Sequence, residues 1–337
     1  MIKKLLFAVI FVCTGYGTAQ AQSGIVDDVS ELEEKLKTER LSVGMLLQSV
    51  AVFSFQDDNF NGGRRYELGA TRLNLQGELP SNFIYRLQLE FRNNPSVLDA
   101  QIGYHFSENL TVIAGQFKPF LSGDLDPSPA DTDFINRARL VGSIMNSREI
   151  GLTALGDVGS INYAVGMYNG FGRAQGNDNR FLYTVRAGYT HELDSGSLNF
   201  SVNGGLNTSQ NEPVGNTGYT SAENRLIYGA FVKYDSDSWF GTIEFLQTNF
   251  EQAFTTIDET ITGFYTTVGN NITEKDQVLV RWDHLSFDVL PQSSERIILG
   301  WNRQISSLMS VQLNMLGQFN DNADDQFGLS GNLQFHF

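Results

Sequence analysis

Hydrophobic and polar residues alternate over most of the chain, in segments of about 9 to 14 residues that are separated by turn residues. In the stretch 82–92, for example, Phe83 and Tyr85 lie on one face, while Arg86 and Gln88 lie on the other. A period of two is typical of a β-strand with one apolar and one polar face. Such strands suit a soluble sandwich, which buries the apolar face, and also a membrane barrel, which turns that face to lipid. The pattern therefore predicts an all-β chain and leaves these two architectures open.

The links between the segments separate the two architectures. Sixteen segments can be distinguished, and the links between them are alternately short and long. An outer-membrane barrel has tight periplasmic turns and longer extracellular loops, whereas the Greek-key links of a sandwich would scramble this order. The exception is the link at 93–95, which is short where a long loop is expected. We therefore predict a transmembrane antiparallel up-and-down β-barrel over 42–337. Its strands are expected near residues 42–55, 65–77, 82–92, 96–105, 109–117, 148–157, 159–168, 181–191, 196–207, 224–235, 237–248, 259–268, 274–285, 294–304, 308–318 and 327–337.

The longest stretch without alternation is 118–147, which we interpret as a loop folded into the barrel. Links of this length without secondary structure are uncommon, and they are usually functional or disordered. Phe134, Leu140 and Ile144 are among several apolar residues that a solvated tail would not carry, so we expect the loop to pack against a concave surface. Charges on such a loop would narrow the passage and set its local field. The charged residues are Lys118, Arg137, Arg139, Asp124, Asp126, Asp131 and Asp133.

The first 21 residues have the three parts of a secretory signal peptide. Lys3 and Lys4 form a basic start, an apolar run follows, and Ala-Gln-Ala at 19–21 supplies a small-residue cleavage site. The apolar run is roughly half of the ~20 residues that a membrane-spanning helix needs. Cys13 is the one cysteine and lies inside this run, so the mature chain would have no thiol for a disulfide or a metal site.

A short periplasmic amphipathic helix is predicted within 22–41. Ile25, Val29, Leu32 and Leu36 have the 4-3-4 spacing of one apolar stripe, over about two heptads. An isolated helix of this length is marginal in water. Two interpretations stay open: three copies could pair as a coiled coil in an oligomeric barrel, or the helix could lie on its own domain or serve as a tether.

The net charge of the chain and its last predicted strand indicate which molecules the protein contacts. The 337-residue chain has a net charge of -15, and so acidic a surface argues against nucleic acid. Leu333, Phe335 and Phe337 share one face of the last predicted strand, and a soluble protein seldom ends on an exposed aromatic residue. This ending resembles the signature by which outer-membrane proteins are recognised for barrel insertion. We therefore expect the cell outer membrane as the location, with its lipid and lipopolysaccharide, the barrel-assembly machinery, and small ions or solutes as partners.

Three motifs resemble the phosphate-selective porin O and P family. They are Gly-Gln-Phe-Lys-Pro-Phe at 115–120, Phe-Ile-Asn-Arg at 134–137 and Arg-Glu-Ile-Gly-Leu at 148–152, in the order and spacing of that family. The resemblance implies a sixteen-stranded trimeric outer-membrane barrel whose third loop folds inward as the constriction. It also implies that members which prefer phosphate use arginines and lysines, whose charged N–H groups bind oxyanions strongly. By position, the candidates are Lys118, Arg137, Arg139 and Arg148 at the constriction, Arg64 and Arg65 at the outer mouth, and Arg72, Arg86 and Arg186 on lumen faces.

The charge balance favours a general porin over a phosphate-selective one. Four aspartates share the loop with two arginines and one lysine, and Glu149 directly follows Arg148. Because the whole chain is strongly anionic, its long-range potential should repel anions more than attract them. We therefore expect passive diffusion of small hydrophilic solutes or ions with mixed or weak selectivity, and phosphate preference stands as the alternative.

Little in the sequence points to catalysis. The histidines are His105, His191, His284 and His336, and Asp283 cannot form a dyad with His284 because adjacent strand residues point to opposite faces. The sequence has no nucleophile elbow, phosphate-binding glycine loop or HExxH motif. We expect no enzyme activity and no cofactor. Two other classes remain as alternatives: an outer-membrane hydrolase of the lipase or protease type, and a soluble secreted β-sandwich that binds ligands.

Cleavage after Ala21 can be tested directly. We expect the exported protein to begin at Gln22, because Ala19 and Ala21 provide the small side chains that such a cleavage site requires. The intact mass of the purified protein measures this. The variant Ala21→Arg should retain the leader, and a wild-type protein that still began at Met1 after export would contradict the prediction.

Overall fold

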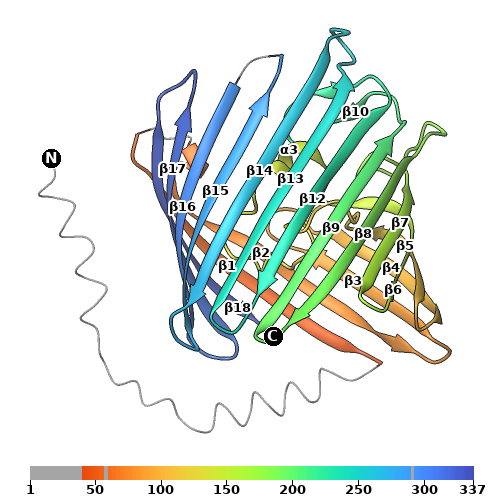
Figure 1. Cartoon of the computed structure of the whole chain (residues 1–337), viewed down its shortest axis with the longest axis horizontal. Helices are drawn as coiled ribbons and strands as arrows, with labels where there is room; N and C mark the ends of the chain where they lie inside the picture. The colour runs from red at the N-terminus through yellow and green to blue at the C-terminus, as the bar shows by residue number, and fades with distance from the viewer. Residues whose placement is uncertain (1–39, 57–59, 290–291) are drawn as a thin grey trace, which may run out of the picture. The chain divides into compact units, whose positions relative to one another are not determined.

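In the part of the chain that the computed structural model describes, residues 40–56, 60–289 and 292–337, the strands form one closed β-barrel (Figure 1). Residues 1–39 lie outside the described residues, and with them the predicted signal peptide and almost all of the predicted N-terminal helix. Within the described ranges, no helix combines the length and the hydrophobicity needed to cross a bilayer.

Sixteen antiparallel strands close the barrel, and β18 pairs with β1 to complete the ring. Two further strands, β10 (Glu212–Pro213) and β11 (Thr220–Ser221), form a small separate sheet in the link between β9 and β12. The barrel strands are β1 (Ser42–Ser54), β2 (Arg64–Leu79), β3 (Phe83–Glu90), β4 (Ser96–Ser107), β5 (Leu110–Phe117), β6 (Glu149–Val158), β7 (Ile161–Tyr168), β8 (Leu182–Leu193), β9 (Gly196–Asn207), β12 (Arg225–Asp235), β13 (Trp239–Glu251), β14 (Asp258–Asn271), β15 (Asp276–Phe287), β16 (Gln292–Gln304), β17 (Met309–Asn320) and β18 (Gln326–His336).

The predicted fold class is confirmed. The sixteen strands lie within a few residues of their expected ranges, and the links between them are alternately short and long. The link at 91–95 is short, as the sequence indicated, and it joins two neighbouring strands of the barrel, because β3 and β4 on either side of it are hydrogen-bonded to each other. The sequence did not predict β10 and β11. It also did not predict the helix α3 (Arg139–Ile144) inside the long stretch that was expected to lack secondary structure.

The alternating residues sort to the two faces of the barrel wall. On β18, Leu329 and Leu333 point outward and are 44% and 47% exposed. Ser330 and Asn332 point into the barrel and are 5% and 2% exposed. The same outward apolar pattern continues around the barrel, as a surface in contact with lipid requires.

β-Bulges reverse this pattern at a few positions. Gln48 of β1 lies opposite both Gly69 and Ala70 of β2, and its Oε1 accepts a hydrogen bond from the backbone N of Ala70 at 3.0 Å. In β4, Leu98 is an extra residue relative to β3, and Asp99 after it points into the barrel. One extra residue moves every following side chain to the other face, so bulges decide which charges reach the lumen.

Part of the inner face of the barrel is apolar. Residues 118–147 run through the interior, where α3 packs against β13, β14 and β15 (Figure 1). Leu140 and Ile144 of α3 form one buried cluster with Leu246 and Ile261, which point inward from β13 and β14. Burial of apolar area, at about 25 cal/mol per Å², attaches the loop to this side of the barrel. A second cluster joins the loop to β15, β16 and β17 through Phe134, Leu279, Ile298 and Leu316.

Gly263 of β14 marks a close approach of the loop to the wall. A Cβ atom added there would lie 2.5 Å from the Cβ of Leu140. We expect Gly263→Leu to push α3 off the wall at a cost of about 1–3 kcal/mol, and so to change the single-channel conductance. Gly204→Leu is the matched control, because a Cβ at Gly204 would meet nothing closer than 3.6 Å. Equal conductance in both variants would contradict the prediction.

Candidate functional site

The first half of the loop is anchored by two buried carboxylates. Glu244 of β13 accepts hydrogen bonds from the backbone N atoms of Gly123 and Asp124, each at 3.0 Å. The Asp124 carboxylate in turn accepts from the backbone N of Ala138 at 2.8 Å and from Arg281 of β15 at 3.2 Å. Asp124 therefore ties the two halves of the loop together and to the wall, and its charge is held inside the packing.

Arg281 is fully buried between two aromatic rings. Its guanidinium carbon lies 4.6 Å from the ring centres of both Phe134 and Tyr265, and its Nε donates to Thr267 Oγ1 at 3.0 Å. Cation–π contacts of this kind contribute up to about 2 kcal/mol when desolvated. The arrangement places a charged residue under the loop, where it stabilises the loop and does not face the solute path.

Arg139 lies at the start of α3 and is also bound to the wall. Its backbone N and its Nε both donate to the Asp283 carboxylate at 2.9 Å, and its Nη1 donates to Ser294 Oγ at 2.6 Å. The Asp283 side chain is almost fully buried and that of Arg139 is nearly so. The charge of this predicted constriction residue is thus largely compensated by Asp283.

The end of the loop is fastened to the link that carries β10 and β11. Arg225 donates two hydrogen bonds to Glu212, both at 2.8 Å, and a third to the backbone O of Ile144 at 2.7 Å. Asn146 donates to Glu149 at 3.0 Å and to Glu212 at 3.3 Å. Because removal of one partner from a buried ion pair costs about 3–5 kcal/mol, this cluster is a strong attachment.

Lys118 organises the first turn of the loop. Its ammonium group donates to the backbone O atoms of Leu125, Asp126 and Pro127 at 2.8, 2.9 and 2.7 Å. Arg137 donates through Nη2 to the same Pro127 carbonyl. Two predicted constriction residues therefore meet at one turn, where both face the opposite wall of the barrel.

That opposite wall carries a strip of arginines. Arg148, directly before β6, donates through Nε to Asp99 at 2.7 Å, and Arg86 lies 3.6 Å from the other oxygen of Asp99. Arg72 pairs with Glu90 at 3.0 Å. Three guanidinium groups thus share two carboxylates, which leaves the strip with an excess of positive charge.

A cavity of about 540 Å³ lies between this strip and the loop, on the side of the long links. Arg72, Arg137, Arg139 and Arg148 line it, and none of the described residues that line it is an aspartate or glutamate. Arg137 Nη1 is buried and has no hydrogen-bond partner among the described residues. We call this space the upper cavity.

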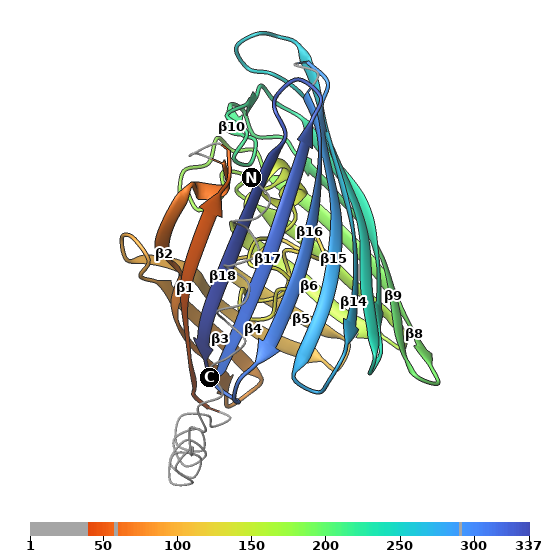
Figure 2. The ribbon, with the colours of Figure 1, turned by 90° about the vertical axis from the view of Figure 1, so that its left-hand side faces the viewer.

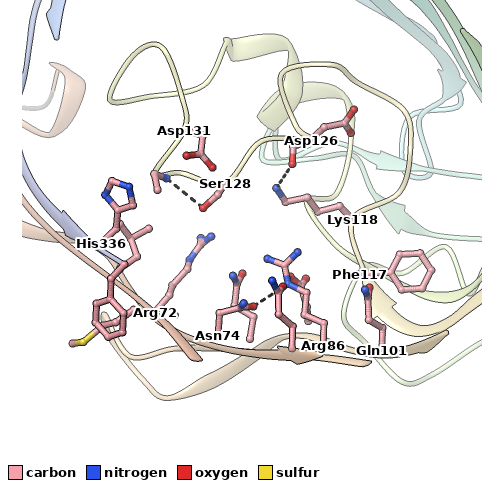
Figure 3. A pocket seen from close by; sticks show the side chains of 18 of the residues that line it. Arg72, Asn74, Arg86, Gln101, Phe117, Lys118, Asp126, Ser128, Asp131 and His336 are labelled. Carbon is pink, nitrogen blue, oxygen red and sulfur yellow. Dashed lines mark hydrogen bonds and ion pairs between the residues drawn. The ribbon is translucent and has the colours of Figure 1, made fainter. Parts of the chain in front are cut away.

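A second cavity, of about 620 Å³, lies on the side of the short turns (Figure 3). Arg72 lines both cavities, so its side chain lies between them. In Figure 3, Arg72 and Arg86 rise from the wall toward Lys118 and Asp126 of the loop. We call this space the lower cavity.

The remaining loop carboxylates lie on the lower side. Asp126 lines the lower cavity and pairs with Arg186 of β8 at 2.6 Å. Asp131 also lines the lower cavity, and with Asp133 it lines neighbouring cavities of the same half of the barrel, one of which includes Asp235 of β12. The upper cavity is therefore lined by arginines without carboxylates, whereas the cavities on the side of the short turns contain both carboxylates and cations.

Arg64 does not stand at the pore mouth, which corrects the sequence-based expectation. It points outward over the ring of Phe53, with 5.2 Å from the guanidinium carbon to the ring centre. The bulge at 69–70 is the reason, since it puts Arg72 on the inner face together with Arg65 and leaves Arg64 on the outer one. Arg65 pairs with Glu67, a half-exposed neighbour on the same inner face.

Most of the partners of the predicted arginines were not apparent from the sequence. Arg281 and Asp283 alternate with the outward Val280 and Trp282, so their position on the inner face was readable from the period of two. Asp99 gave no such signal, because the bulge before it reverses the pattern. The pairing of each arginine with a particular carboxylate depends on contacts between strands that are distant in the sequence. The alternation of residues within one strand does not encode these contacts.

The histidines lie apart from the cavity walls described above, with the exception of His336 in the lower cavity. His284 points outward and contacts Glu295 at 2.6 Å, while Asp283 beside it points inward to Arg139. Adjacent residues thus face opposite sides, as predicted. In the described ranges, no group of three or more His, Cys, Asp or Glu residues is arranged to hold a metal ion.

Comparison with known families now identifies the chain. The family described as phosphate-selective porin O and P matches residues 48–266, which is more than half of the 337 residues. The chain belongs to this family. It is an outer-membrane porin, a passive channel through a β-barrel, and the predicted family, location and general function are confirmed. No curated protein matches the sequence.

Solved structures share the fold of this porin at low sequence identity. The anion-selective porin from Comamonas acidovorans has 13% identity and a TM-score of 0.67, over 88% of this chain and 99% of its own. OprB of Pseudomonas putida has 10% identity and a TM-score of 0.67, over 92% and 97%. The outer membrane protein OmpT of Vibrio cholerae, in its trimer form, has 8% identity and a TM-score of 0.67, over 88% and 99%.

The charge of Lys118 should depend on pH in the neutral range. Burial, together with the nearby charges of Arg137 and Arg148, lowers the pKa of Lys118 to about 7. The side chain is therefore a cation below this pH and neutral above it. We expect the anion-to-cation permeability ratio of the porin to fall as the pH rises from about 6 to about 8, which reversal potentials in a salt gradient measure. Lys118→Met should abolish this step, and a step of equal size in the variant would refute the assignment to Lys118.

Proposed function

We propose that this porin passes small anions, inorganic phosphate among them, in preference to cations. The observation that carries the proposal is the upper cavity, which is lined by four arginines and by none of the described carboxylates. Guanidinium groups bind oxyanions through charge-assisted and often bidentate hydrogen bonds. The similar fold of the anion-selective Comamonas acidovorans porin and the family description support the same direction.

The positions of the loop aspartates favour this proposal over mixed selectivity. Asp124 is buried in an ion pair beneath the loop, and Asp126 is paired on the lower side. Asp131 and Asp133 line cavities of that same lower half. None of the loop aspartates therefore lines the upper cavity, and of its four arginines only Arg72 shares a second cavity with Asp126 and Asp131.

We further infer that the loop at 118–147 forms the constriction. It is attached to the inner face along its length, and its free side, with Arg137 and Lys118, faces the arginine strip. Arg72 on that strip lines the cavities both above and below the loop. A solute crossing the barrel would pass between these cationic groups, in the manner of charged rings in selective pores.

A homotrimer is the assembly that we infer. Strands β3, β5 and β7 each have eight residues, fewer than the about 9–11 that a strand needs to cross a bilayer. The barrel wall is therefore lower on the side of these three strands, and neighbouring copies of the chain would shield this side from lipid. The trimer form recorded for OmpT of Vibrio cholerae, which has a similar fold, supports this assembly. The mass of the detergent-solubilised complex tests it.

The division into a signal peptide at 1–21, a periplasmic helix at 22–41 and the barrel at 42–337 remains our proposal for the whole chain. Leu333, Phe335 and Phe337 would serve as the insertion signal for the barrel-assembly machinery. The outward position of Leu333 on β18 is compatible with that role. We also infer that the porin carries out no catalysis, which the family assignment supports. Lipid or peptide hydrolysis by the purified protein would overturn this inference.

Reversal of the charge at position 137 tests the anion preference. Two charge units at about 8 Å in water change the energy of an ion by roughly 1 kcal/mol. Because the reversal disfavours an anion and favours a cation by this energy each, we expect Arg137→Glu to lower the anion-to-cation permeability ratio by roughly 30-fold, as measured by reversal potentials in asymmetric chloride. Addition of phosphate should reduce the chloride current of the wild type more than that of the variant.

Arg173→Glu provides the matched control, since Arg173 is exposed in the link between β7 and β8 and reaches Ser96 at 3.5 Å. This variant carries the same change in charge away from the two cavities, so its reversal potential should equal that of the wild type. A cation-selective wild type, or equal effects of the two variants, would refute the proposal.

A further inference from the structure

The upper cavity is lined by neutral hydrogen-bonding side chains as well as by arginines. These neutral side chains are Asn136, Ser143, Ser147 and Asn216. Within residues 40–56, 60–289 and 292–337, none of the four side chains has a hydrogen-bond partner. Asn136, Ser147 and Asn216 are exposed, and Ser143 is buried in α3. The cavity thus offers hydroxyl and amide groups that are available to a solute, beside the guanidinium groups that would hold its charge.

Asn216 reaches the cavity from the long link that carries β10 and β11. Its backbone N donates to the backbone O of Gly142 in α3 at 2.8 Å, so the turn between these two short strands contacts the helix. Gly215, with a φ of +51°, permits this approach, because a Cβ atom there would collide with the same carbonyl. Figure 2 shows β10 at the end of the barrel where the long links lie. Asn216 therefore belongs to the outer part of the cavity lining.

The excess positive charge around the upper cavity corresponds to a dianion. Arg137 donates to the Pro127 carbonyl, and it pairs with no carboxylate of the described chain. Arg148 shares Asp99 with Arg86, so one more guanidinium charge lacks a counter-charge. The two other arginines of the cavity are each paired with one carboxylate. A phosphate monoester carries close to two negative charges near neutral pH, whereas a carboxylate carries one.

The upper cavity is also larger than a bare oxyanion requires. Its volume is about 540 Å³, whereas one water molecule occupies about 30 Å³ of the liquid. Ligand sites for small organic molecules have volumes of ~300–1,000 Å³. Leu98 and Pro129 add apolar surface to the lining, which suits the C–H groups of a carbohydrate ring. The size and the mixed lining thus match an organic anion with hydroxyl groups.

We propose that the upper cavity is a binding site for phosphate esters of sugars and similar polyols. The phosphate group lies between Arg137 and the arginine strip, and the hydroxyl groups bind Asn136, Asn216 and the two serines. This inference rests on the anion preference proposed above and names the class of solute that the same cavity selects. The hydroxyl contacts distinguish the ester from inorganic phosphate, because a site whose polar groups pair with a hydroxyl group disfavours a solute that lacks it.

Titration of the chloride current through the full-length mature porin in planar bilayers tests the proposal. The titration is made at about pH 8, where both kinds of phosphate are largely dianions. We expect glucose-6-phosphate to block the current at about a tenfold lower concentration than inorganic phosphate, since two neutral hydrogen bonds contribute about this factor. Gluconate should block more weakly than glucose-6-phosphate because it is a monoanion, and glucose should not block.

The double variant Asn136→Ala/Asn216→Ala removes two of the available amide groups. Both side chains are exposed, so the fold should tolerate their loss. The preference for glucose-6-phosphate over inorganic phosphate should fall by about tenfold in this variant. Asn93→Ala/Asn94→Ala is the matched control, because these two exposed asparagines of the link at 91–95 line neither the upper nor the lower cavity. The control should keep the preference of the wild type.

The possible outcomes separate this inference from the proposed function. Equal block by glucose-6-phosphate and inorganic phosphate in an anion-selective wild type would overturn the inference and leave the anion preference standing. Block by glucose at the same concentration would also overturn it, since the phosphate group would then contribute nothing. An equal preference in the two double variants would refute the contacts with Asn136 and Asn216. A cation-selective wild type that neither phosphate blocks would refute the proposed function itself.

Discussion

The attachment of residues 118–147 to the inner wall is the constraint on which the rest of this structure depends. At its centre, Arg281 is stacked between two aromatic rings and paired with Asp124 from the loop. A charge removed from water in this way is tolerated only when its partners are complete, and the loss of one partner costs about 3–5 kcal/mol. The loop supplies both Asp124 and the Phe134 ring, so the buried arginine and the folded loop require each other.

This attachment divides the interior into a packed half and an open half. Leu246, Ile261 and the side chains of α3 fill the packed half, as in the core of a soluble protein. The open half lies against the shorter strands and holds the arginine strip. Asp124 and Arg139 of the loop are paired on the packed side, whereas Lys118 and Arg137 face the open half. Asp126 and Asp131 lie in the open half toward the short turns. The anion preference that we propose would follow from which face of the loop is attached to the wall.

The architecture was predictable because its signals are local. A period of two in each strand and the order of short and long links are properties of neighbouring residues, and both were read correctly. The loop could be located, and Lys118, Arg137, Arg148, Arg72 and Arg86 do lie around one pair of cavities. What the sequence concealed was non-local. A single bulge at 69–70 turned Arg64 outward, another bulge turned Asp99 inward, and the ion pairs that neutralise Arg139 and Asp124 join residues more than a hundred positions apart.

The uneven placement of charge along the lumen would give the proposed channel a direction. The arginines of the upper cavity would concentrate mobile anions near the outer opening, and the carboxylates on the side of the short turns would concentrate mobile cations near the inner one, so that two regions of different fixed charge meet at a junction. Such a junction conducts more readily under one sign of applied voltage than under the other. A Donnan potential across the outer membrane would therefore modulate the ionic throughput of this barrel without any moving part.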